Sequence, residues 1–198
     1  MSISAKLVKE LRDRSGVGMM DCKKALLESK GDLDKAFEVL RKNGVAKAQK
    51  KAGREAKEGS IISYIHPGSK LGVLLELNCE TDFVANTDDF KNLANDICMH
   101  IAATAPISIN SEDVSQSILD KEKEIYLEQA RKSGKPENII EKMVDGRVKK
   151  FLQENVLLEQ NFVKDPSKTI TDLITDKVSV LGENIIVNSF SRFQVGEK

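Results

Sequence analysis

Three helical patterns follow one another at the start of the chain. The first begins after Ser4, which suits an N-cap, and ends at Gly16. The second ends at Gly31, and the third begins at the capping residue Asp32 and ends at Asn43-Gly44. Apolar residues recur every three or four positions in all of them: Ile3, Leu7, Val8, Leu11, Met19, Cys22, Ala25, Leu26, Leu33, Ala36, Phe37 and Leu40. The spacing predicts a compact bundle of three short helices over residues 1–45.

The pattern changes at Gly59, where runs of Ile, Val and Leu replace the helical spacing. Residues 60–66 and 71–79 form two such runs, and Pro67-Gly68-Ser69 between them supplies turn residues, which predicts an antiparallel hairpin. A helix capped by Thr87 then carries one continuous apolar stripe: Phe90, Leu93, Ala94, Ile97, Cys98, Ile101 and Ala102. This helix is expected to cover the sheet.

The remaining residues predict a helical hairpin and one further strand. Two helices, over residues 115–132 and 136–155, are separated by Ser133-Gly134-Lys135. An extended segment through Phe162 and a short helix near residues 169–175 follow, and the alternation over residues 184–195 predicts a strand that joins the earlier hairpin. The fold class is therefore α+β: a three-helix bundle over residues 1–45, a basic helical linker over residues 46–58, and a core over residues 59–198 with a small antiparallel sheet, covering helices and a helical hairpin.

The composition of the 198 residues indicates a cytoplasmic protein. No apolar run approaches the roughly 18 residues of a membrane span. The first residues, MSISAKLVKELRDR, lack the apolar stretch of a signal peptide. The three cysteines, Cys22, Cys79 and Cys98, are an odd number without metal-ligand spacing, so we expect reduced thiols and no metal site.

Charge is distributed unevenly although the formal net charge is zero. Residues 1–58 carry 15 Lys and Arg against 9 Asp and Glu, and most of this excess lies in residues 41–58. Such a basic run suits either a solvated linker helix or a surface that attracts nucleic acid or an acidic protein. No aromatic residue interleaves with it to stack on unpaired bases, so no direct contact with nucleic acid is expected.

The sequence contains no recognisable set of catalytic residues. Gly16-Val17-Gly18 follows a helix rather than a strand, which favours a turn over a phosphate-binding loop. The two histidines, His66 and His100, favour surface and packing roles over a nucleophilic triad or a metal site. We therefore expect a protein that is not an enzyme and binds no cofactor.

One segment, Asn78 to Asn86, combines acidic and aromatic residues directly after a strand. Phe83 follows Thr81 and Asp82 immediately before a helix. The residues allow two interpretations. In the first, which composition alone favours, the ring of Phe83 folds inward onto the core; in the second, Asp82 fixes the loop and Phe83 is presented to a partner.

Several motifs together resemble the signature segments of the elongation factor Ts family. They are LVKELR at residues 7–12, GMMDCKKAL at 18–26, TDFVAN at 81–86, GKP at 134–136, EKMV at 141–144, GR at 146–147 and RFQVGE at 192–197. The resemblance spans essentially the whole chain in order. It implies an N-terminal bundle similar to ubiquitin-associated domains (UBA-like), then an α+β core. Longer members have two related core subdomains; this chain has one and resembles the short form, so the resemblance implies a homodimer.

The resemblance also implies a function and a set of contact residues. The family exchanges guanine nucleotide on elongation factor Tu: it binds the GDP-bound form, promotes GDP release and stabilises the nucleotide-free form until GTP binds. The partner-binding positions that it implies are Thr81, Asp82, Phe83, Val84, Arg12, Met19, Met20, Lys23 and His66. For Met19 and Met20 the alternative is packing within the bundle. Two other functions stay open: a passive UBA-like adaptor, and a nucleic-acid-associated protein that uses the basic segment.

Overall fold

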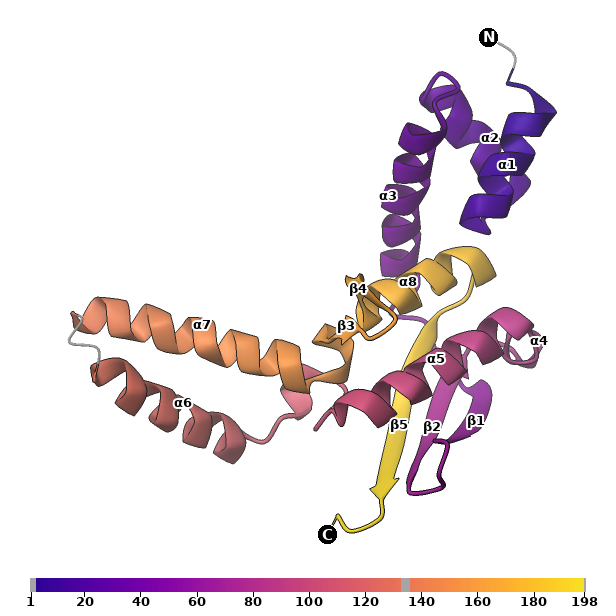
Figure 1. Ribbon diagram of the computed structural model, residues 1–198. Coiled ribbons are helices and arrows are strands. Elements are labelled where there is room, and N and C mark those ends of the chain that lie inside the picture. The colour runs from indigo at the N-terminus through magenta and orange to yellow at the C-terminus, as the bar shows by residue number, and fades with distance from the viewer. Residues whose placement is uncertain (1–2, 133–135, 198) are drawn as a thin grey trace. The chain divides into compact units, whose positions relative to one another are not determined.

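The computed structural model describes residues 3–132 and 136–197 and has the predicted α+β architecture (Figure 1). Two compact units are each assembled from three stretches of the chain. The first comprises Met1–Ile62, Leu75–Asn95 and Asp172–Asn188, and the second comprises Ser63–Leu74, Asp96–Thr171 and Ser189–Lys198. Within the described residues no helix is both long and apolar enough to cross a bilayer.

Three helices form the N-terminal bundle: α1 (Ala5–Ser15), α2 (Met19–Glu28) and α3 (Leu33–Lys51). The predicted caps are confirmed. The hydroxyl of Ser4 accepts the N–H of Leu7 at 3.3 Å, and the carboxylate of Asp32 accepts the N–H of Lys35 at 3.0 Å. Predicted apolar positions supply most of the core, in which Val8, Leu11, Cys22, Ala25, Leu26, Ala36 and Leu40 are buried. Val17, which was expected only in a turn, is buried there too, whereas the predicted Met19 is 46% exposed.

Helix α3 does not end at Asn43-Gly44 as the sequence predicted. It continues without a break to Lys51, through a segment that contains the helix-forming residues Ala46 and Ala48. Gly44 is buried within it, and a Cβ atom there would lie 2.8 Å from the Oγ of Ser179. This glycine therefore marks a close approach between two helices and not a helix end.

Three strands form a sheet with the order β1-β2-β5 (Figure 1). It contains β1 (Glu58–Ile65), β2 (Leu71–Cys79) and β5 (Ile185–Gln194), so the last strand joins the hairpin as predicted. Thr87 caps α5 (Asp88–Thr104) by accepting the N–H of Phe90 at 3.2 Å. The whole predicted stripe of α5 is buried, as are the inward residues Val73, Leu75, Leu77, Cys79, Ile185 and Val187 of the strands.

Helices α6 (Gln116–Arg131) and α7 (Glu137–Asn155) form the predicted helical hairpin. Its small core contains Ala130, Ile140 and Val144, with Tyr126, Leu127, Met143 and Val148 packed against them. The predicted connection, Ser133-Gly134-Lys135, lies outside the described residues, and so does part of the GKP motif.

The segment after α7 contains more regular structure than predicted. It contains the 3-10 helix η2 (Leu157–Glu159) and a two-stranded sheet of β3 (Asn161–Phe162) and β4 (Asp165–Thr169). A further 3-10 helix, η1 (Ser111–Asp113), lies between α5 and α6. Helix α8 (Ile170–Leu181) replaces the short helix expected near residues 169–175. His100 is fully buried beside this segment, which confirms a packing role for that histidine.

Candidate partner-binding site

A one-turn helix, α4 (Asp82–Ala85), presents Phe83 to solvent. Val84 and Ala85 are buried, whereas Phe83 is 81% exposed. Successive residues of a helix point about 100° apart, so burial of the second half of this turn directs Asp82 and Phe83 outward. The inward interpretation of Phe83, which composition alone favoured, is therefore wrong: the ring does not pack on the core.

Hydrogen bonds hold both ends of α4. At its start, the hydroxyl of Thr81 accepts the N–H of Val84 at 3.5 Å. At its end, the side-chain amide of Asn86 donates to the carbonyl oxygen of Asp82 at 2.9 Å, and the hydroxyl of Thr87 donates to the carbonyl oxygen of Val84 at 2.8 Å. The backbone that carries Phe83 is thus fixed although its ring is free.

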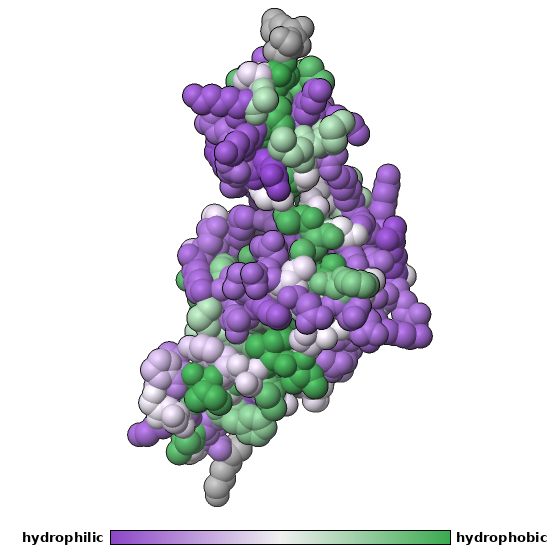
Figure 2. Space-filling view, turned by 90° about the vertical axis from the view of Figure 1, so that its right-hand side faces the viewer, coloured by the Kyte–Doolittle hydropathy of each residue, from purple (hydrophilic) through white to green (hydrophobic). Residues whose placement is uncertain are grey.

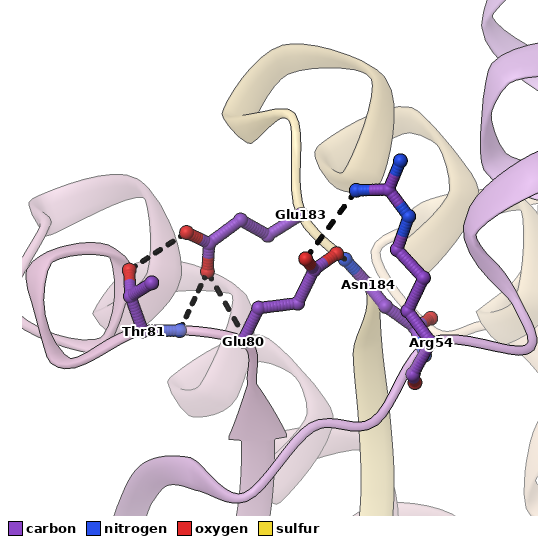
Figure 3. A network of polar contacts seen from close by, with 5 residues as sticks. All are labelled: Arg54, Glu80, Thr81, Glu183 and Asn184. Atoms are coloured by element: carbon purple, nitrogen blue, oxygen red, sulfur yellow. Dashed lines mark hydrogen bonds and ion pairs between the residues drawn. The ribbon is translucent and has the colours of Figure 1, made fainter.

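Two glutamates on different segments each accept backbone N–H groups from the other's segment beside this turn (Figure 3). Glu183, just before β5, accepts the N–H groups of Glu80 and Thr81 at 3.1 and 3.0 Å and the hydroxyl of Thr81 at 2.7 Å. Glu80 in turn accepts the N–H of Asn184 at 2.7 Å and forms an ion pair with Arg54 at 3.4 Å. We call these five residues, Arg54, Glu80, Thr81, Glu183 and Asn184, the glutamate clasp.

The clasp stabilises the ionised form of Glu80. Chiefly the N–H of Asn184, and then Arg54, lower the pKa of the Glu80 carboxyl below its ordinary value. Burial raises the pKa of the neighbouring Cys79 thiol, and the charge of Glu183 adds to that effect. Cys79 therefore stays a neutral thiol, and it donates a hydrogen bond to the carbonyl oxygen of Thr81 at 3.1 Å.

Sequence reasoning singled out the segment with Phe83 but missed the clasp. Glu183 and Asn184 lie about 100 positions after Glu80, and Arg54 lies in what was expected to be a linker. Gly182 has a left-handed backbone conformation with φ of 80°. A glycine at this position indicates the turn that ends α8, but it does not indicate the contacts of Glu183. No spacing in the sequence relates the two glutamates.

The predicted contact residues of the bundle are all accessible to solvent. Met19 and Met20 are 46% and 66% exposed at the start of α2, so they do not fill the bundle core. Arg12 and Lys23 are exposed as well. Met19 and Met20 precede Lys23 by four and three positions, which places the three side chains on neighbouring parts of one helix face.

His66 is exposed at the end of β1, where the hairpin turns. Its backbone N–H donates to the carbonyl oxygen of Leu71 at 2.8 Å, and its ring Nδ1 lies 3.0 Å from the hydroxyl of Tyr64. His66 belongs to the second compact unit, whereas the bundle and α4 belong to the first.

The basic segment is partly neutralised by acidic partners. Lys47, Arg54 and Lys57 form ion pairs with Asp21, Glu80 and Glu55, respectively. Figure 2 shows that, on the face turned to the viewer, hydrophobic residues reach the surface in separate groups between hydrophilic ones.

This arrangement suits a protein that acts by contact. In the part of the chain that the structure describes, no group of three or more His, Cys, Asp or Glu side chains is placed to hold a metal ion. The accessible chemistry at α4 is a carboxylate beside an aromatic ring, which serve recognition. Fold and site together define an α+β binding protein that presents an aromatic residue on a fixed turn.

Known proteins similar to this chain include several elongation factors Ts. A family model described as elongation factor TS matches residues 27–197. Elongation factor Ts of Fervidobacterium nodosum is 59% identical over 197 residues, which cover 100% of both chains. Elongation factor Ts of Thermoanaerobacter sp. (strain X514) is 56% identical over 195 residues, covering 98% of this chain and 96% of that protein. The chain belongs to the elongation factor Ts family, the nucleotide exchange factors for elongation factor Tu, which are not enzymes.

Proposed function

We propose that this chain releases GDP from elongation factor Tu by inserting Asp82 and Phe83 beside the magnesium and phosphate site of that partner. It binds the GDP-bound form, and the inserted ring disturbs the packing around the nucleotide. The nucleotide-free complex then persists until GTP binds. The observation that carries this proposal is the exposure of Phe83, which is 81% on a turn held at both ends. Translation elongation takes place in the cytoplasm, where the factor would work.

Exchange of this kind needs differential binding and no covalent step. A factor that binds the nucleotide-free partner more tightly than the GDP-bound one weakens GDP binding by the same coupling free energy. A weakening of about ten-thousandfold requires about 5.5 kcal/mol. Burial of one phenylalanine side chain contributes about 1.5–3 kcal/mol. Other contacts must therefore supply the rest of the coupling free energy.

We assign part of that remaining free energy to contacts of the N-terminal bundle. Met19 and Met20 offer exposed, flexible apolar side chains, which adapt well to a partner surface, and Arg12 and Lys23 add positive charge around them. His66 supplies a further polar contact from the hairpin. Thr81 and Val84 contribute indirectly by supporting α4, because the Val84 side chain is buried beneath it and Thr81 caps its start.

We also propose that the chain forms a homodimer. An apolar groove at the end of the sheet is lined by Ile65, Leu74, Phe193 and Val195, among other residues. Phe193 and Val195 are 65% and 72% exposed, and Ile65 is 63% exposed. Such a concentration of exposed apolar side chains is typical of an interface. A second copy would bury it.

Release of fluorescent GDP from elongation factor Tu, followed with and without this chain, tests the proposed function. Acceleration that saturates with the concentration of the chain is expected. Binding without acceleration would indicate the passive adaptor instead. Affinity for nucleic acid that falls steeply with added salt would indicate the third function.

A further inference from the structure

The glutamate clasp ties the turn that presents Phe83 to a segment about 100 residues later. We propose that Glu183 is a positioning residue for nucleotide exchange: by holding Thr81 it fixes the direction in which Phe83 leaves the surface. This inference rests on the proposed role of Phe83 and adds a residue that does not itself touch the partner.

The ring of Phe83 has little support of its own. It is 81% exposed, so contacts with the rest of the chain do not set its direction. The direction of the Cα–Cβ bond is then set by the backbone of α4, which has only four residues. Isolated short helices are unstable in water, because a single turn forms too few hydrogen bonds to offset its loss of conformational entropy. The turn therefore depends on what holds its first residues.

Glu183 provides that hold through three hydrogen bonds to two adjacent residues. One carboxylate oxygen accepts the N–H groups of Glu80 and Thr81 at 3.1 and 3.0 Å, and the other accepts the hydroxyl of Thr81 at 2.7 Å. Hydrogen bonds to a charged acceptor are stronger than neutral ones. Thr81 is thus fixed at both its backbone and its side chain.

The hydroxyl of Thr81 passes this constraint on to α4. Because its hydrogen is directed to Glu183, its lone pairs remain for the N–H of Val84, which lies 3.5 Å away. Val84 directly follows Phe83 and is buried. The carboxylate of Glu183 therefore holds Thr81, two residues before Phe83, and acts through its hydroxyl on Val84, directly after Phe83.

The second glutamate fixes Glu183 in return. Glu80 accepts the N–H of Asn184 at 2.7 Å, and Asn184 donates through its side chain to the carbonyl oxygen of Arg54 at 2.8 Å. As Figure 3 shows, the two carboxylates point in different directions, each toward the other's segment. Each segment therefore supplies a carboxylate that binds the backbone of the other.

The main alternative is that the clasp only stabilises the fold. The conservative variant Glu183→Gln separates the two roles. Its amide keeps one acceptor oxygen, but its NH₂ group would donate to the hydroxyl of Thr81, which reverses the bond that orients the cap. A positioning role predicts that GDP release at saturating concentrations of the chain falls about tenfold, as expected when one charge-assisted hydrogen bond is lost. The concentration needed for half-saturation should change less than about twofold, because the bundle contacts are intact.

Three further variants complete the experiment. Glu55→Gln removes the charge of an exposed glutamate that pairs only locally with Lys57, and it should exchange at the wild-type rate. Thr81→Val removes the hydroxyl while keeping the side-chain volume, and it should slow exchange as Glu183→Gln does. Thr81→Ser should restore it. If circular dichroism shows that Glu183→Gln is unfolded at the assay temperature, the two Thr81 variants test the positioning role instead.

The double variant Phe83→Ala with Glu183→Gln distinguishes positioning from an independent effect. If Glu183 acts through Phe83, the double variant exchanges at the rate of Phe83→Ala alone. Losses that multiply, or a wild-type rate for Glu183→Gln and Thr81→Val in folded protein, would overturn the positioning role. A wild-type rate for Phe83→Ala would instead overturn the proposed function itself.

Discussion

Phe83 and Val84 are neighbours in the chain, yet they lie in opposite environments: Phe83 is 81% exposed and Val84 is 9% exposed. This contrast predicts a separation between stability and function. Val84→Ala removes buried apolar atoms and should lower the free energy of unfolding by about 2 kcal/mol. Phe83→Ala should change it by less than about 0.5 kcal/mol. Urea denaturation of both variants measures this, and a stability loss for Phe83→Ala as large as that for Val84→Ala would contradict it.

Two glycines inside helices should respond in opposite ways to alanine. Alanine favours a helix over glycine by about 1 kcal/mol, and at Gly146 in α7 an added Cβ meets no atom within 4 Å, so Gly146→Ala should stabilise the protein. At Gly44 the Cβ would lie 2.8 Å from the Oγ and 3.1 Å from the Cβ of Ser179. Gly44→Ala should therefore lower the free energy of unfolding by about 1 kcal/mol.

Thermal denaturation of the two glycine variants gives the comparison directly. Equal stabilisation by both would mean that α3 and α8 do not approach closely at Gly44.

His100 predicts a loss of stability in mildly acidic solution. It is fully buried; its Nδ1 accepts the N–H of Val163 at 3.3 Å, and its Nε2 lies 2.9 Å from the Oε1 of Gln160, an acceptor. These partners suit the neutral ring with hydrogen on Nε2. Burial lowers the pKa of His100 below its ordinary value of 6.5, although the hydrogen bond with Gln160 opposes this.

The sign of the pH effect follows from that pKa. The unfolded chain binds a proton at His100 near pH 6.5, whereas the folded chain binds it only at lower pH. Stability is complete above pH 6.5 and is lost as the pH falls toward the lower pKa of the folded state. Denaturation at pH 7.5 and pH 5.5 measures the slope, which His100→Gln should reduce. An unchanged slope in His100→Gln would contradict the assignment.

The apolar groove predicts that the oligomeric state depends on Phe193. Light scattering should give twice the chain mass of 21.9 kDa at micromolar concentration. Phe193→Asp should give the monomer, because it would bury an unpaired charge in the interface. Ile139→Asp, at a 43% exposed position on α7, is the matched control and should stay dimeric. A monomeric wild-type chain, or a dimeric Phe193→Asp, would contradict the proposed homodimer.

Local patterns predicted most of the elements because their causes are local. The caps Ser4, Asp32 and Thr87 and the buried stripe of α5 could be identified since a cap acts over three residues and a helix face repeats every 3.6. The predicted end of α3 was wrong because Gly44 is required by the close approach of Ser179, which lies 135 positions later in the chain. The direction of Phe83 was open because it depends on the burial of Val84 and on the clasp with Glu183. Contacts between residues so far apart in the chain produce no recognisable spacing in the sequence.

The most direct test of the central claim is the rate at which fluorescent GDP leaves elongation factor Tu in the presence of Phe83→Ala. Val163→Ala, which truncates another exposed apolar side chain at a 43% exposed position, serves as the control. Loss of the roughly 1.5–3 kcal/mol that a buried phenylalanine contributes corresponds to a rate about 13- to 160-fold lower. We expect that decrease for Phe83→Ala at saturating concentrations, with the wild-type rate for Val163→Ala. A wild-type rate for Phe83→Ala would contradict the account.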